Sequence, residues 1–182
     1  VGYGTKRDCL KKEPRKGNKI VVVGGDNYRI GLGGGSVSSV DTGRYSSGIE
    51  LNAVQRANPE MQKRANNLVR ALCEEDVNPV VSIHDHGSAG HVNCLSELVE
   101  DCGGLIDMTK LPIGDPTLSS REIIANESQE RMGLLIDEEH IEHVNKIAQR
   151  ERAPMYVVGE TTGDKHFAFE QGDGVRPFDL DV

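Results

Sequence analysis

The chain has no tryptophan, and aromatic residues make up only 4% of its 182 residues. A hydrophobic core must therefore be built from aliphatic side chains, and the apolar content of 36% is enough for one domain of ordinary size. The sequence also lacks a signal-peptide pattern and any apolar run of about 20 residues, which argues against a secreted or membrane-spanning protein. We expect a cytoplasmic protein.

Positive charge is in short supply as well. The chain has 29 acidic and 21 basic residues, which gives a formal net charge of −8. An acidic surface repels both the nucleic-acid phosphate backbone and anionic lipids. We therefore expect no nucleic-acid partner and no membrane partner.

Cysteine is sparse and its spacing is uninformative. The four cysteines include no CxxC pair, so a disulfide framework is not indicated and free thiols in a reducing compartment are the expectation. Cys73 and Cys94 fall in helical patterns, and we expect both to be small core residues.

We expect this sequence to be a piece of a longer chain. Val1 stands where an initiator Met is expected, and residues 178–182 show no pattern of a C-terminal helix or tail. Residues 1–18, with basic residues, Pro14 and Gly17, are predicted to lead in from a preceding domain. Residues 19–182 are predicted to form a single domain.

Hydrophobic periodicity predicts strands that alternate with helices. Strands are expected at 20–23, 80–83, 105–108, 131–136, 155–158 and 166–169, and helices at 59–75, 88–100, 119–125 and after residue 137. This order predicts the α+β class, with α/β layers in which a mixed sheet is covered by helices. The last two strands are close enough in sequence for an antiparallel hairpin.

One run of six polar or charged residues leads directly into an apolar strand. Its members are Asn126, Glu127, Ser128, Gln129, Glu130 and Arg131. Carboxylate, hydroxyl, amide and guanidinium groups at one strand entrance suit the binding of a polar small molecule. The alternative is a solvated loop between a helix and a strand.

A glycine-rich loop spans residues 31–39. Glycines allow backbone N–H groups to approach an anion closely, so Gly33, Gly34, Gly35 and Ser36 are candidates for a phosphate-binding loop. No Walker GK[ST] follows, and the spacing lacks the third glycine of a dinucleotide fingerprint. A purely structural tight loop is therefore the alternative.

A second polar and glycine-rich cluster occupies residues 84–91, at the end of a predicted strand. Asp85 is placed there to bind Mg²⁺, a cation that uses one or two carboxylates and completes its shell with water and substrate phosphate. Its alternative role is to cap a helix that begins near Ser88. A zinc site would use His84, Asp85, His86, His91 and Cys94. Zinc is disfavoured because structural zinc usually takes its ligands from two separated pairs.

Taken together, these segments resemble the phosphoribosylformylglycinamidine synthase family in its large single-chain form. The matching stretches are 24–25, 30–35, 53–61, 83–90, 126–131 and 150–154. They cover nearly the whole chain in order. The resemblance implies the C-terminal half of the first of two modules related to aminoimidazole ribonucleotide synthetase, with the fold of that enzyme's C-terminal domain.

The resemblance also implies a function. The family enzyme is an ATP-dependent ligase of purine biosynthesis that converts formylglycinamide ribonucleotide to the amidine with glutamine-derived ammonia. It implies that Gln55 and residues Glu127, Ser128 and Gln129 contact the ribonucleotide, and that Asp85 binds Mg²⁺. ATP would be bound mainly by the ATP-binding half, with the second module and the glutaminase domain as further partners in the same chain.

No catalytic residue is assigned. Cys94 and Cys102 lack the context of a glutaminase nucleophile, so we expect this chain alone to be inactive. His86 and His91 depart from the family pattern and could alter the pocket. Two other functions stay open: a non-catalytic structural or interaction domain, and a lobe of another ATP-dependent enzyme of the same superfamily.

Overall fold

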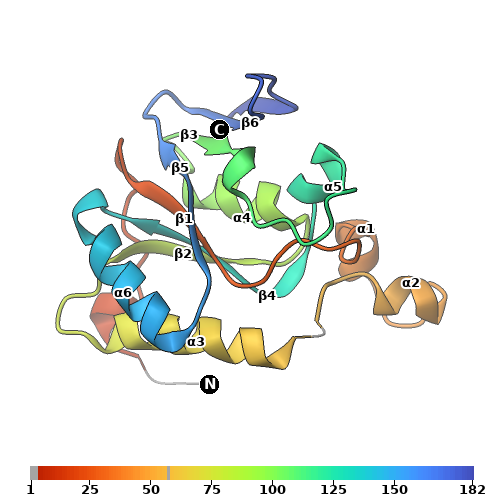
Figure 1. Ribbon diagram of the computed structural model, residues 1–182, viewed down its shortest axis with the longest axis horizontal. Coiled ribbons are helices and arrows are strands. Elements are labelled where there is room, and N and C mark those ends of the chain that lie inside the picture. Colours follow the sequence, from red (N-terminus) through yellow and green to blue (C-terminus); the bar gives the residue numbers. More distant parts are fainter. Residues whose placement is uncertain (1–3, 57) are drawn as a thin grey trace.

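The sheet is built around a short strand, β1 (Lys19–Val23), in which the four apolar residues Ile20, Val21, Val22 and Val23 are all buried. The computed structural model describes residues 4–56 and 58–182. The other strands are β2 (Val80–His86), β3 (Gly104–Asp107), β4 (Ser128–Ile136), β5 (Met155–Thr161), β6 (His166–Glu170) and β7 (Phe178–Asp181). Their order in the described chain is β2-β4-β1-β5-β3-β6-β7 (Figure 1). Only β3 and β6 pair in parallel, which makes the sheet mixed, as predicted.

Helices cover both faces of the sheet, which confirms the predicted layers. Helices α3 (Pro59–Glu74) and α6 (Ile141–Glu151) lie on one face, and α4 (Gly90–Leu98) and α5 (Ser120–Ile124) lie on the other (Figure 1). Two short helices, α1 (Gly35–Ser38) and α2 (Ser47–Leu51), extend to one side. The described residues also contain three 3-10 turns: η1 (Lys6–Asp8), η2 (Met108–Lys110) and η3 (Glu138–His140).

Strand β1 divides the core into two clusters because its side chains alternate between the faces. Val21 and Val23 pack with the apolar residues of α3 and α6. Ile20 and Val22 pack with those of α4 and α5. Aliphatic side chains thus fill most of the interior, as the aromatic-poor composition requires.

The predicted hairpin between the last two expected strands is wrong. Strand β3 lies between β5 and β6, antiparallel to the first and parallel to the second. The connection passes around the start of β3, where Thr162 N donates to Gly103 O at 3.1 Å and Lys165 N donates to Cys102 O at 3.0 Å. Gly103 has φ +85°, and a Cβ there would lie 2.7 Å from His166 N. Only glycine lets the connection pass so closely.

Strand β7 was not predicted, and it forms the outer edge of the sheet. Phe178 on this strand meets Phe167 and Phe169 of β6, with ring centroids 5.8 and 6.0 Å apart. These are all three phenylalanines of the chain. The phenylalanines are therefore gathered where the outer strands of the sheet need apolar cover.

The cysteines divide into buried and exposed pairs, and all four thiols are free. Cys94 is a core residue, as predicted, and burial raises the pKa of its thiol. Cys73 is exposed, which corrects the prediction. Leu68 and Leu72 define the buried face of α3, and Cys73 lies about 100° around the helix from Leu72.

The structure describes the lead-in segment from residue 4 onward; residues 1–3 of this predicted segment lie outside the described residues. Arg7 donates to the carbonyl oxygens of Cys73 at 3.1 Å and Glu75 at 3.0 Å, just where α3 ends.

No helix in the described ranges combines the length and the hydrophobicity needed to cross a membrane.

Candidate functional site

Three predicted segments meet at the start of β4. Gln55 pairs in parallel with Ser128, since Gln55 N donates to Glu127 O at 3.0 Å and Gln129 N donates to Gln55 O at 2.9 Å. Glu127 N in turn donates to Gly31 O at 2.8 Å. The segment that ends at Gln55, the glycine-rich loop and the polar run are therefore joined through their backbones, although they are far apart in the sequence.

The turn after β2 joins the same assembly. Glu127 Oε1 accepts a hydrogen bond from Ala89 N at 2.9 Å. The glycine-rich loop packs against this turn so closely that a Cβ on Gly35 would lie 2.6 Å from Ser88 Oγ. Residues 31–36, 55, 87–89 and 127–129 thus form one continuous polar site, which we call the β4 junction.

The predicted substrate residues have different exposures at the β4 junction. Gln55 is 6% exposed, and Glu127 and Ser128 are fully buried, whereas Gln129 is exposed. Three buried atoms have no hydrogen-bond partner among the described residues: Gln55 Oε1, Glu127 Oε2 and Ser128 Oγ. An unpartnered buried polar atom costs about 1–3 kcal/mol. This part of the junction therefore has unused hydrogen-bonding capacity.

The glycine-rich loop is ordered by its own hydrogen bonds. Ser36 Oγ donates to Gly33 O at 2.9 Å, and Ser38 Oγ donates to Gly34 O at 3.1 Å. Gly34 has φ +63°, a backbone conformation that favours glycine. The loop lies beside the other predicted site residues, and its proposed role in phosphate binding stays a prediction.

Asp85 is an exposed residue near the end of β2, where it pairs in register with Met132. It does not cap α4, because the residue before that helix is Ala89 and makes no side-chain cap. Across residues 4–56 and 58–182 no three His, Cys, Asp or Glu side chains converge as a metal site. A single carboxylate still suits Mg²⁺, which takes its remaining ligands from water and substrate phosphate.

The histidines of the 84–91 cluster lie in different environments. His84 Nδ1 is 2.8 Å from Glu97 Oε2 in a half-buried position, whereas His86 and His91 are fully buried. The register of β2 against β4 shifts between Asp85 and His86, so the two strand histidines do not share a face. The crowded spacing in the sequence therefore does not bring the ligands of a zinc site together.

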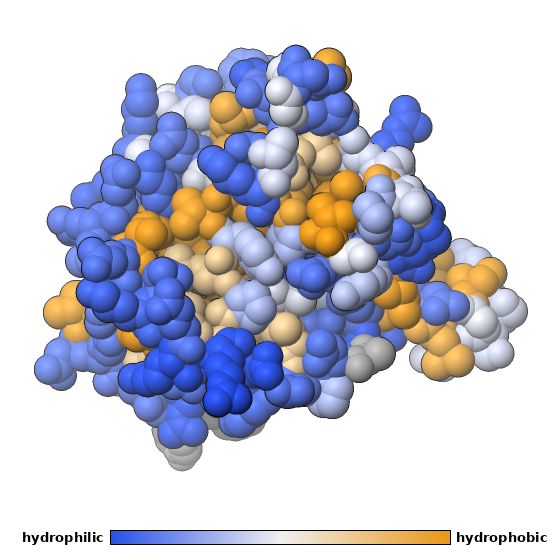
Figure 2. All heavy atoms as spheres, in the orientation of Figure 1, coloured by the Kyte–Doolittle hydropathy of each residue, from blue (hydrophilic) through white to orange (hydrophobic). Residues whose placement is uncertain are grey.

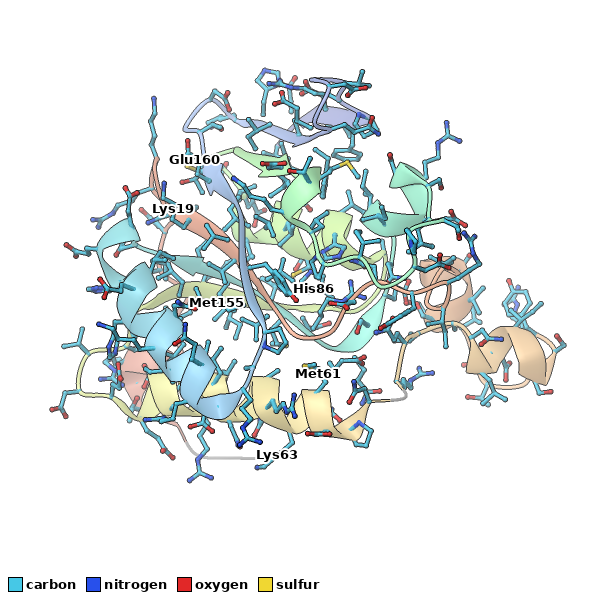
Figure 3. The ribbon with its side chains drawn as sticks, in the orientation of Figure 1. Lys19, Met61, Lys63, His86, Met155 and Glu160 are labelled. Carbon is cyan, nitrogen blue, oxygen red and sulfur yellow. The ribbon has the colours of Figure 1, made fainter. Side chains whose placement is uncertain are left out.

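A hollow of about 530 Å³ opens beside Gln55. Its lining residues are Gly25, Asp26, Tyr28, Ile30, Gln55, Asn58, Met61, Glu130, Pro154 and Tyr156. In Figure 3, Met61 points from α3 toward the sheet, and Met155 lies on β5 nearby. Figure 2 shows hydrophobic residues gathered across the middle of this face with hydrophilic ones around them. The hollow therefore combines apolar walls with a few polar groups.

The polar groups of the hollow are connected to each other. Gln55 Nε2 donates to Glu130 Oε1 at 2.9 Å and to Asp26 O at 3.1 Å. Tyr156 OH lies 3.5 Å from Asp26 Oδ1, and burial together with this carboxylate raises the pKa of Tyr156. Asp26, Glu130 and Tyr156 were not among the predicted site residues. Glu130 could have been found, because it lies two residues after Ser128 in a strand and so shares its face.

Behind the β4 junction lies a fully buried guanidinium, that of Arg131. Its Nη1 donates to Asn27 Oδ1 at 2.7 Å and to His91 Nε2 at 2.9 Å, and its Nη2 donates to Asn126 Oδ1. Burial lowers the pKa of Arg131 to about 10, so it stays charged at neutral pH. These acceptors are neutral groups, and the positive charge is solvated by dipoles.

The two buried histidines continue this network. Because Arg131 Nη1 is a donor, His91 Nε2 accepts, and His91 Nδ1 then carries the proton and donates to His86 Nε2 at 2.9 Å. Burial lowers the pKa of both imidazoles well below the ordinary value, and the charge of Arg131 lowers them further. Both rings are therefore neutral and lie outside the hollow. Neither histidine lines the hollow, so any effect of these two residues on the pocket must be indirect.

Residues 15–171 match the family described as AIR synthase related protein, C-terminal domain. The chain is 40% identical over 184 residues to phosphoribosylformylglycinamidine synthase of Dictyostelium discoideum, a match that covers 99% of this chain and 14% of the relative. It is 41% identical over 161 residues to the Homo sapiens protein of the same name, covering 87% of this chain and 12% of that one. The chain thus spans a small part of these relatives.

Solved structures agree with this fold. T. maritima PurL complexed with FGAR has a TM-score of 0.80 at 24% identity, covering 94% of this chain and 28% of the other. T. maritima PurL complexed with ATP has a TM-score of 0.72 at 22% identity, covering 94% of this chain and 26% of the other. At these identities the likeness establishes the fold alone.

Proposed function

The chain belongs to the AIR synthase related protein family as its C-terminal domain, and from this we propose that it is the substrate-binding lobe of phosphoribosylformylglycinamidine synthase. The full-length protein would be an ATP-dependent ligase of de novo purine biosynthesis in the cytoplasm. It would convert formylglycinamide ribonucleotide (FGAR) to the amidine with ammonia derived from glutamine. Within it, residues 19–182 would form this domain.

The observation that carries the proposal is the β4 junction itself. Gln55 and Glu127 come from distant segments, yet their backbones are hydrogen-bonded to each other, and both side chains keep a buried polar atom without a protein partner. Polar groups arranged in this way suit a ligand with many hydrogen-bonding groups. A ribonucleotide with an amide side chain has such groups.

We assign the remaining ligands by the same reasoning. Asp85 would hold Mg²⁺ as one carboxylate ligand, and Gly33, Gly34, Gly35 and Ser36 would lie against a phosphate. ATP, which is bound in a solved T. maritima PurL structure, would be held mainly by other parts of the full-length protein, with the second module and the glutaminase domain as further partners. Mg²⁺ would offset phosphate charge during the activation of the amide oxygen.

The proposal is tested with Gln129→Ala in the full-length protein. Gln129 is exposed, so its removal should leave the fold intact, while the loss of one hydrogen bond raises the Michaelis constant for FGAR by roughly tenfold. The constants for ATP and glutamine should stay unchanged. Gln149→Ala is the matched control, because Gln149 is an exposed glutamine on α6. Unchanged FGAR kinetics in Gln129→Ala would favour a non-catalytic interaction domain.

A further inference from the structure

The charged groups that line the hollow beside Gln55 are all carboxylates, those of Asp26 and Glu130. Gln55 Nε2 donates one hydrogen bond to Glu130 Oε1 and one to the backbone oxygen of Asp26. The carboxylates of Glu130 and Asp26 are therefore left as acceptors, and no Lys, Arg or His is among the lining residues. Such a surface repels a phosphate and attracts groups that donate hydrogen bonds.

Glu130 is the side chain on which the inference rests. It is only 2% exposed, and one of its two carboxylate oxygens has a hydrogen-bond partner among the described residues. Its Oε1 accepts from Gln55, but among the described residues no hydrogen bond reaches its Oε2. Glu130 lines the hollow, and a carboxylate oxygen at its wall without a described partner can accept a hydrogen bond from a ligand.

The walls restrict the kind of donor. Tyr28, Ile30, Met61 and Pro154 supply apolar surface, and the phenol of Tyr156, which stays protonated, is directed at Asp26. The volume of about 530 Å³ has room for a pentose. A sugar offers apolar C–H faces to the walls and adjacent hydroxyl groups to the acceptors at the floor, and carboxylates are established partners of ribose hydroxyls in nucleotide sites.

We infer that this hollow is the ribose subsite of the ligand, and that Glu130 is its specificity-determining residue through a hydrogen bond accepted from a ribose hydroxyl. The inference rests on the proposed function and extends it to a residue outside the predicted set. It also orients the ligand. The ribose occupies the acceptor-lined hollow, and the phosphate points away from Glu130 and Asp26.

The test uses the full-length protein and calorimetric binding of three ligands: FGAR, its 2′-deoxy form and its 3′-deoxy form. Wild-type protein should bind at least one deoxy form roughly tenfold more weakly than FGAR, as expected for one lost hydrogen bond to a carboxylate. In Glu130→Ala this discrimination should disappear, because the acceptor is gone. Glu130→Gln has the same shape and keeps a carbonyl acceptor, so it should retain part of the discrimination and serves if the alanine variant fails to fold.

The control is Glu139→Gln, which removes one negative charge at an exposed position on η3 and should leave all three affinities unchanged. Equal weakening of all three ligands in both Glu130 variants would mean a structural role and overturn the inference. Wild-type protein that binds FGAR without discriminating against either deoxy form would also overturn it, while the proposed function stands. Absence of FGAR binding to the wild-type protein would overturn both.

Discussion

Arg131 connects three parts of the chain through one buried side chain. Its guanidinium reaches Asn27 after β1, His91 on α4 and Asn126 before β4. The planar fork of donors in arginine can serve these acceptors together, whereas the ammonium of lysine is a compact point charge. The planar geometry of the guanidinium, and not its charge alone, therefore allows Arg131 to join these three segments.

We predict that Arg131→Lys lowers the free energy of unfolding by about 3 kcal/mol, since at least one charged hydrogen bond is lost and neutral acceptors stay buried without a donor. Urea denaturation of the chain measures this change. Arg70→Lys is the control, because Arg70 forms only an exposed pair with Glu74 on α3, and it should cost less than about 0.5 kcal/mol. Equal effects of the two substitutions would contradict the role given to Arg131.

The neutral pair His86 and His91 makes stability depend on pH. Both folded-state pKa values lie below the ordinary value of 6.5, so in acid the unfolded chain binds protons that the folded chain does not. The free energy of unfolding should be insensitive to these groups above pH 6.5. Below it the free energy should fall by up to about 1.4 kcal/mol per pH unit for each histidine.

His91→Asn removes one of the two titrating groups and should reduce the histidine part of this acid slope by about half. Thermal or urea unfolding at several pH values between 5 and 8 measures the slope, with half-buried His140→Gln as the comparison. A slope in His91→Asn equal to that of the wild type would mean that the folded chain takes up the proton.

At the residue scale, sequence reasoning found polar residue types but not their exposure. Gln55 and residues 127–129 were grouped through a family resemblance, and the structure places their backbones in contact. Asp26 was missed, and Glu130 was named only as a member of the polar run, because their role depends on a hollow formed by the segment after β1 together with α3, β4 and β5. No local pattern encodes which charged residues share such a cavity.

At the scale of elements, the β4 junction depends on glycine where the loop crosses β4. Gly31 has φ +77°, and a Cβ there would clash with the carbonyl oxygen of Glu127. Gly34 has a similar φ of +63° but open space around its Cα. The two positions therefore separate backbone strain from steric contact.

We predict that Gly34→Ala costs about 1–3 kcal/mol from the backbone alone, because φ +63° combined with ψ −176° is a conformation that essentially only glycine adopts. Gly31→Ala should cost clearly more, because the added methyl group must also displace the paired backbone of Glu127. Chemical denaturation measures both variants. Similar losses would show that the loop moves freely away from β4, contrary to the hydrogen bond between Glu127 N and Gly31 O.

Elements with strong local signals were predictable, and pairings were not. Helix α3 begins as expected, with the side chain of Asn58 accepting from Met61 N at 2.9 Å and Pro59 in the first turn. The pairing of β5 and β6 with β3, and the existence of β7, depend on partners far away in the sequence. Apolar alternation specifies a strand but does not specify its neighbours.

At the scale of the whole molecule, we predict that this chain alone has no synthetase activity. Its cysteines include no glutaminase nucleophile candidate, since Cys94 and Cys102 are buried and Cys9 and Cys73 lie on the surface without a catalytic partner assigned by the sequence. Incubation of the purified chain with FGAR, ATP, Mg²⁺ and either glutamine or ammonia should yield no amidine above background. Amidine formation with ammonia would contradict the assignment of ATP binding to other parts of the full-length protein.

The central place of β1 affects how the chain acquires its structure during synthesis. Residues 19–23 are translated before their hydrogen-bonding partners, which are residues 132–136 on one side and 155–160 on the other. The strand with the most completely buried side chains therefore waits, unpaired, while more than a hundred further residues are translated. An unpaired run of valine and isoleucine is prone to associate with other chains. Protection of this run in the nascent chain, by a chaperone or by early helices such as α3, is the requirement that this topology imposes on the cell.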